Sequence, residues 1–327
     1  MAFERAVTMP DTTAPETAWR VIARYNAQRA LVARRMFFRL MIVVVPVIMG
    51  AAATIGIILT QGPGPSVYGL MIACFVLFCV GGTMAVSPSR QFQRDFRSAL
   101  LPAVFDFVED CVYRFRTDPA FMKTFPIDSL VEHVDVRHFY MLTGLHHGMR
   151  FTLTETEYVD NGDVSQGILF RGVVLQFELA NYFPGTLIAV PQAFSARREV
   201  HNFFRRRNLG IVRSGDRKVD HWHEFRTDTQ PATKMLVESE IKEVLYCIGR
   251  AWPDELVRLF LLGSTGYLLV TARKNVFEIP GIDQSIVYDT HLRPMIRELS
   301  SLLSAANSLR NAVMVKQEDF HERSGIR

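Results

Sequence analysis

A stretch without charged side chains lies near the N-terminus and constrains the fold of this chain more than any other feature. No Asp, Glu, Lys or Arg occurs from Leu40 to Ser89, a gap of 50 residues in a chain that is otherwise 21% charged. Two apolar runs, Leu40–Thr60 and Val67–Val86, fill most of this gap. At about 1.5 Å per residue, each run is about 30 Å long, which matches the hydrocarbon core of a bilayer. The pattern predicts a hairpin of two membrane-spanning helices.

The segment between the two runs predicts a tight turn. It reads Gln61-Gly-Pro-Gly-Pro-Ser66, and Gly and Pro interrupt helices. Pro46 inside the first run is tolerated in a membrane helix and would kink its axis. Two alternatives remain open. The runs would be buried helices of a soluble core, or the first would be a cleaved signal peptide, because Ala51-Ala52-Ala53 resembles a cleavage site.

Arginines on both flanks of the apolar runs predict the orientation of the hairpin. Three precede the first run and three follow the second, namely Arg34, Arg35, Arg39, Arg90, Arg94 and Arg97. The turn between the runs carries no charge. The positive-inside rule then places both termini in the cytoplasm and the turn on the far side. The predicted location is the inner (cytoplasmic) membrane, with a multi-pass topology.

The positive charge of the chain is concentrated ahead of the first apolar run. Residues 1–39 contain seven arginines and three acidic residues, and their net charge of +4 equals that of the whole chain. A nucleic-acid-binding domain is normally basic itself, so nucleic acid is an improbable partner. Residues 15–39 also predict a helix. It would either lie on the inner leaflet, with Trp19 and Tyr25 among the headgroups, or extend the first membrane helix.

The residues behind the hairpin predict a cytoplasmic α+β domain with an antiparallel sheet. Residues 88–118 show apolar positions at three- and four-residue steps, which predicts one long amphipathic helix. From Phe151 the sequence alternates, and Asn161-Gly162 is typical of a hairpin turn. The predicted divisions are a basic arm (1–39), a membrane hairpin (40–87), a connecting helix region (88–145), an α+β domain (146–316) and a loose tail (317–327).

Within the α+β domain, strands and helices are predicted from local periodicity. Strands are expected at 167–179, 185–190, 266–272 and 275–279. Helices are expected at 195–207, 233–251, 254–262 and 289–313. The four cysteines form no CxxC pair, so we expect reduced, buried side chains, as in a cytoplasmic domain.

Two neighbouring runs resemble a known family. Phe170-Arg-Gly-Val-Val-Leu-Gln-Phe-Glu-Leu179 and Phe183-Pro-Gly-Thr-Leu-Ile-Ala-Val-Pro191 are similar to the central signature of the bacterial DUF3137 family. Glu224-Phe225 ahead of a helix, and the leucine-rich last helix, also match the family's order of elements. The resemblance implies a bacterial protein with two N-terminal membrane helices. It supplies no catalytic residues, because the domain is of unknown function.

A basic segment is the main candidate binding site. Residues 196–218 carry eight basic and two acidic side chains, a local net charge of +6. The candidates for contact with lipid phosphates or an acidic protein partner are Arg197, Arg198, Arg205, Arg206, Arg207 and Arg213. A solvated helix face is the simpler interpretation, and RNA binding is a third, although no aromatic–basic RNA motif supports it.

Other candidate sites are weaker. His221 and His223 would share one side of an extended strand, and with His201 they would hold a catalytic zinc. Glu155 and Glu157 would pair as acid and base, although exposed strand carboxylates are far commoner. We therefore assign no catalytic, cofactor or metal residue. The leading hypothesis is a non-enzymatic interaction domain that binds a protein or the anionic inner leaflet, and the alternative is a membrane-bound metal-dependent hydrolase.

Overall fold

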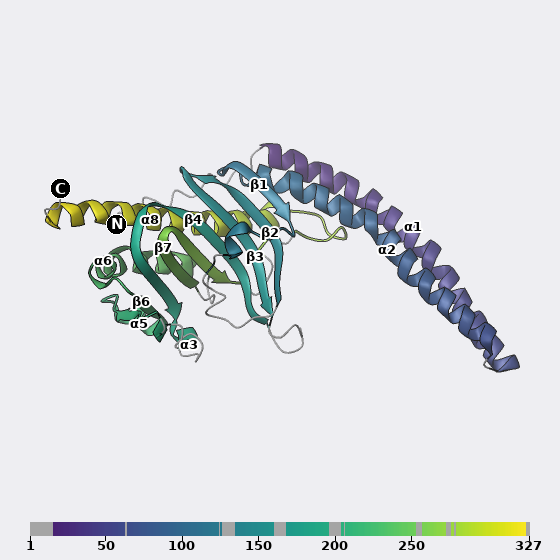
Figure 1. The fold of residues 1–327 in the computed structure, drawn as a ribbon. Coiled ribbons are helices and arrows are strands. Elements are labelled where there is room, and N and C mark those ends of the chain that lie inside the picture. The colour runs from purple at the N-terminus through teal and green to yellow at the C-terminus, as the bar shows by residue number, and fades with distance from the viewer. Residues whose placement is uncertain are drawn as a thin grey trace. The chain divides into compact units, whose positions relative to one another are not determined.

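The computed structural model divides the chain into two compact units (Figure 1). The helical unit comprises Ala14–Val104 and Ile279–His291, and the sheet unit comprises Phe105–Glu278 and Leu292–Arg327. The structure describes residues 16–62, 64–123, 125, 135–159, 168–195, 204–205, 207–252, 257–272, 276–277 and 279–324.

Two long helices pack side by side in the helical unit. They are α1 (Glu16–Gln61) and α2 (Pro65–Val104). Both are long and apolar enough to cross a membrane, and only 6% of the most apolar window of each is buried. Helices in the core of a soluble protein are mostly buried, so these two do not resemble core helices. The two helices pack closely at Gly50 and Gly81. A Cβ added at Gly50 of α1 would meet Cys74 of α2, and one added at Gly81 of α2 would meet Val43 of α1.

Both helices run further than the apolar stretches. α1 continues unbroken from Glu16 through Pro46, so the basic residues before Leu40 extend the first helix. α2 likewise continues through Pro88, and the expectation of a separate helix starting there is wrong. The two extensions pack on each other, because the Tyr25 ring lies 5.3 Å from Phe92 and 4.1 Å from Phe96. The α2 extension therefore packs on the α1 extension, a contact that the sequence pattern did not predict.

A strap from near the C-terminus completes the helical unit. Residues 279–291 lie against α1, where the Asn26 amide donates to the Ile286 carbonyl at 2.9 Å and accepts from the Ile286 N–H at 3.0 Å. The Trp19 and Tyr288 rings are 5.6 Å apart, and Ile286 and Tyr288 are buried. One side chain therefore satisfies both backbone groups of a residue 260 positions away.

An antiparallel sheet of seven strands organises the sheet unit. The strands are β1 (Glu109–Phe115), β2 (Asp135–His146), β3 (Met149–Val159), β4 (Ile168–Pro191), β5 (Gly210–Val212), β6 (His223–Thr227) and β7 (Val257–Thr271). Their order is β1-β2-β3-β4-β6-β5, and β7 also pairs with β4. β4 is thus the central strand, with three neighbours, as its near-continuous burial requires.

Helices and an aromatic cluster bury both faces of the sheet. The helical segments are η2 (Ala120–Lys123), α3 (Gln192–Ser195), α5 (Arg217–Trp222), α6 (Gln230–Leu236), the π-helix η4 (Val237–Ile241), α7 (Lys242–Ala251), the π-helix η5 (Tyr288–Leu292) and α8 (Arg293–Ser324). α8 packs on β4 and β7 with a row of buried leucines. On the face of Val174 and Leu269, the cluster contains Phe121, Phe125, Phe170, Phe194, Phe204 and Phe260.

The region predicted as a connecting helix is divided between the two units. The helix ends at Val104, two residues after Pro102, and residues 109–115 form β1. Cys111, Tyr113 and Phe115 are half-buried and alternate with exposed neighbours, a two-residue period hidden within the four-residue steps. The α+β domain therefore begins near Phe105 and not at residue 146.

Several other predicted elements differ. Residues 257–262, expected to be helical, form the first half of β7, whose backbone pairs with β4. The strands expected at 167–179 and 185–190 are one bulged strand. Residues 276–277 form a turn, and Asn161-Gly162 lies outside the described residues. α8 reaches Ser324, so the tail expected to be loose is helical that far. All four cysteines are free, but none is buried.

Candidate functional site

The structure describes three of the six candidate arginines. Arg205, Arg207 and Arg213 are exposed, whereas Arg197, Arg198 and Arg206 lie outside the described residues. Arg205 follows the buried Phe204, which anchors this stretch in the aromatic cluster. Arg213 follows the short edge strand β5. The helix predicted at 195–207 is described only at its ends, by α3 and by Phe204–Arg205.

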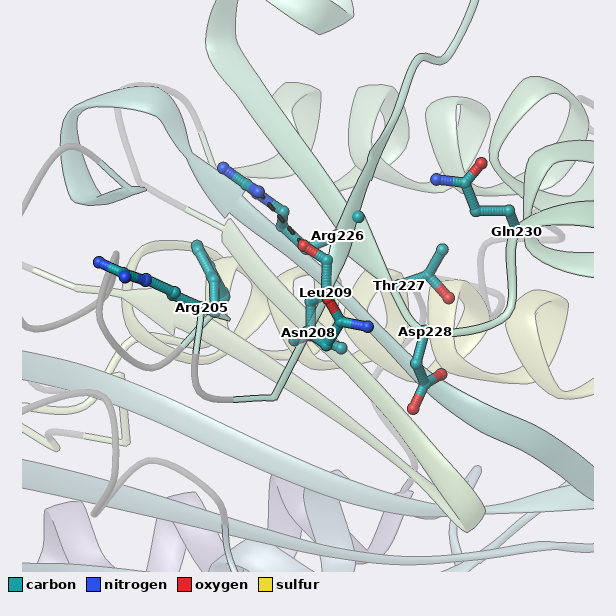
Figure 2. Close-up of a pocket in the computed structure, with 9 residues that line it drawn as sticks. Arg205, Asn208, Leu209, Arg226, Thr227, Asp228 and Gln230 are labelled. Atoms are coloured by element: carbon teal, nitrogen blue, oxygen red, sulfur yellow. Dashed lines mark hydrogen bonds between the residues drawn. The ribbon is translucent and has the colours of Figure 1, made fainter.

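A hollow of about 480 Å³ opens beside Arg205 (Figure 2). It lies where β5, β6 and the start of α6 meet, and its walls are partly polar and partly apolar. The residues that line it are Phe204, Arg205, Asn208, Leu209, Gly210, Arg226, Thr227, Asp228 and Gln230. Figure 2 shows Arg205 and Arg226 on one side, with Asp228 and Gln230 on the other. The hollow therefore offers positive charge at one end and a carboxylate at the other.

Arg226 is a fixed part of this wall. Its Nε donates to Glu224 Oε1 at 2.5 Å, and its Nη1 donates to the Leu209 carbonyl at 3.2 Å. The guanidinium also lies 5.2 Å from the centre of the Phe204 ring. Only 16% of the side chain is exposed. Because its charge is already balanced by Glu224, Arg226 shapes the hollow more than it attracts a ligand.

Asp228 holds the turn on the other side of the hollow. Its Oδ1 accepts a hydrogen bond from the Thr186 N–H at 2.7 Å and another from the Thr229 hydroxyl at 2.9 Å. Gly185 next to it has φ of +113°, which favours glycine, and a Cβ there would meet Thr229. The turn of β4 and the start of α6 are thereby tied to each other.

The connection between β5 and β6 is ordered by two aspartates. Asp216 caps α5 by accepting from the Lys218 N–H at 2.8 Å, and Asp220 accepts from the Ser214 N–H at 2.9 Å. The Lys218 N–H bond lowers the pKa of Asp216, so the capping carboxylate stays ionised. Exposed cations, including Arg213, surround this connection.

The three histidines considered as zinc ligands are not placed together on one strand. His221 lies in the last turn of α5, whereas His223 is the first residue of β6, and His201 is outside the described residues. Burial lowers the pKa of His223, which favours its neutral imidazole. Among the residues that the structure describes, no group of three or more His, Cys, Asp or Glu is placed to hold a metal ion.

The two glutamates considered as an acid–base pair are buried. Glu155 and Glu157 both lie on β3, and we expected exposed side chains there. Glu157 is opposite Arg171 of β4 in the strand register, so a cation is its cross-strand neighbour. This placement indicates a buried polar layer within the sheet.

Comparison with protein families now adds to this picture. Residues 168–311 match the family described as "Protein of unknown function (DUF3137)". This region is somewhat less than half of the chain. The match confirms the resemblance seen in the sequence. It runs from the first residue of β4 into α8, so the matched region contains the hollow, the described candidate arginines and the β5–β6 connection.

Other comparisons add little. No curated protein matches the chain. Among solved structures, it is similar to the "crystal structure of the mycobacterial trehalose monomycolate transport factor A, TtfA", at 11% sequence identity and a TM-score of 0.35. The similarity covers 60% of this chain and 88% of that chain. At this TM-score it carries no argument about function.

Proposed function

We propose that this protein is a membrane-anchored, non-enzymatic interaction protein, whose DUF3137-matching region binds anionic phospholipid headgroups of the cytoplasmic leaflet. The ligands of those phosphates are Arg205, Arg207 and Arg213. In this proposal α1 and α2 form the membrane hairpin, both termini are cytoplasmic, and the arginines beside the apolar runs set the orientation.

The anchor supports the choice of lipid as ligand. A domain tethered to a bilayer meets the headgroups at a high effective concentration, so weak contacts are sufficient for binding. The inner leaflet is negatively charged, and each Arg near its surface contributes about 1 kcal/mol of attraction. An acidic protein surface would satisfy the same charges, and it is the competing partner that the experiment must exclude.

One observation carries the proposal: two exposed arginines of the segment, Arg205 and Arg213, are not neutralised by an ion pair within the described residues. Arg226, only two strand positions from Glu224, shows the contrasting case of a guanidinium balanced by a carboxylate. Guanidinium groups that the fold leaves in solvent are available for bidentate contacts with phosphate.

The test uses the full chain in nanodiscs of phosphatidylcholine, with or without phosphatidylglycerol and a photoactivatable phosphatidylglycerol analogue. We expect the analogue to crosslink to residues 204–222. In the Arg205→Glu, Arg207→Glu, Arg213→Glu triple variant, crosslinking should fall by at least tenfold, because three attractions of about 1 kcal/mol each become repulsions.

A matched control reverses three exposed arginines elsewhere in the sheet unit, Arg114, Arg150 and Arg250. This variant has the same net charge as the first and should keep its crosslinks. Equal crosslinking of all three proteins would refute the role of the segment. Crosslinks that are absent in nanodiscs but appear on an acidic protein in native membranes would instead favour a protein partner.

A further inference from the structure

An exposed tryptophan stands among the cations of the β5–β6 connection. Trp222 ends α5, and 67% of it is exposed. Within the described residues, its one ring contact is His221, whose ring centre lies 5.3 Å away. An indole left in water is stabilised when an apolar surface covers its ring.

Three cations lie on the same β5–β6 connection as Trp222. Arg213, Arg217 and Lys218, on the same connection, are exposed. These three cations outnumber the two aspartates of the connection, Asp216 and Asp220, so its net charge is positive. An exposed indole on a positively charged connection complements a bilayer surface, whose headgroups are negative and whose interior is apolar.

We propose that Trp222 inserts into the cytoplasmic leaflet as an interfacial anchor, with Arg213, Arg217 and Lys218 on the surrounding phosphates. This inference rests on the proposed function and names the side chain that enters the bilayer. Indole prefers the headgroup region because its ring is apolar and its N–H needs a hydrogen-bond partner. The cap of Asp216 on α5 presents Trp222 on an ordered element, so insertion costs little conformational entropy.

Fluorescence of Trp222 tests the insertion directly. The chain has two other tryptophans, so the probe is the full-length Trp19→Phe, Trp252→Phe double variant. It is reconstituted in phosphatidylcholine vesicles with and without phosphatidylglycerol, and then in vesicles whose acyl chains are brominated. With phosphatidylglycerol present, we expect the emission of Trp222 to shift to the blue and to lose most of its intensity to the brominated chains. In phosphatidylcholine alone, neither change is expected.

Two further variants separate the anchor from a general loss of structure. Trp222→Ser should weaken lipid crosslinking of residues 204–222, whereas Tyr182→Ser, which alters a side chain that is 68% exposed on β4, should leave it unchanged. Equal crosslinking of the Trp222→Ser variant and the parent would overturn the anchor.

The outcomes distinguish this inference from the proposed function. Crosslinks that depend on the arginines, with an unquenched Trp222, would overturn insertion and leave lipid binding intact. Neither crosslinks nor quenching would overturn both. A blue shift without quenching by brominated chains would show that a protein surface, including a second copy of this chain, covers Trp222, and that would also overturn insertion.

Discussion

Gly172 shows why one residue of the family signature is a glycine. It lies on β4 between β3 and β7, and a Cβ at this position would collide with the Val270 carbonyl oxygen and approach Thr271 Cα at 2.8 Å. These are backbone atoms of the paired strand, which cannot rotate away as a side chain would. The absence of a side chain therefore permits the close β4–β7 pairing on which the sheet is built.

Replacing Gly172 with Ala should destabilise the protein by about 1–3 kcal/mol, because the added methyl group has no space. The measurement is thermal unfolding of the full chain in detergent, followed by circular dichroism. Gly249→Ala is the matched control, since Gly249 lies in α7 with no atom within 4 Å of its added Cβ. That variant should gain about 0.5–1 kcal/mol. A Gly172→Ala protein as stable as the parent would contradict this account.

The histidines and the tryptophan of His221-Trp222-His223 show how a residue's role depends on its element. As an extended strand, the triplet would place both imidazoles on one side. In the structure a helix ends at Trp222 and a strand begins at His223, so the two rings belong to different elements and the intervening tryptophan is the exposed side chain. The residue types suggested a metal site as one possibility, whereas the local fold leaves Trp222 as an exposed aromatic side chain.

At the scale of elements, backbone pairing overrides local periodicity. The β1 strand was hidden because Phe107, Cys111 and Phe115 recur at helical spacing. The edge of β2 offers hydrogen bonds from Tyr140 to Leu145, and these select the extended form. The same competition turned residues 257–262 into strand, because β4 pairs with residues 259–262. Helices α6, η4 and α7 together lie close to the single helix predicted at 233–251. In this segment the helical spacing of the apolar residues and the packing against another helix favour the same structure.

The strap on α1 leads to a prediction about a single element. Asn26→Ala removes both hydrogen bonds to Ile286, which contribute about 1 kcal/mol each. Hydrogen exchange of peptides covering residues 282–291 should become roughly tenfold faster or more, while exchange of the strands remains unchanged. Gln28→Ala changes an exposed neighbour on the same helix and should have no effect. Unaltered exchange in Asn26→Ala would show that the strap is held by its apolar residues and by the hydrogen bond from Arg29 to the Asp283 carbonyl.

At the scale of the whole molecule, the length of the two helices is informative. α1 has 46 residues and α2 has 40, so they are about 69 Å and 60 Å long. A bilayer core takes up only about 30 Å of each. If they cross a membrane, the remainder projects beyond it as a paired stalk, and the strap of residues 279–291 binds this stalk on α1 at Asn26, 14 positions before Leu40.

This topology predicts the result of protease protection. In intact spheroplasts, a protease added outside should leave the region behind residue 90 undigested, and it should cut this region after the membrane is permeabilised. The protein should also remain in the membrane pellet after alkaline carbonate extraction, because hydrocarbon solvates both apolar runs. Digestion of the C-terminal region in intact spheroplasts would reverse the orientation, and release into the supernatant would contradict the hairpin.

The sequence by itself determined the two long apolar helices, the antiparallel character of the sheet, the family that the central strands resemble and the position of the basic segment. These properties follow from composition and short-range periodicity, which depend only on neighbouring residues. Tertiary structure alone decided that Arg226 is balanced by Glu224, that Arg205 and Asp228 line one hollow, and that Trp222 is exposed. The hollow depends on strand register between segments distant in the sequence, and register is set by the packing of the whole sheet.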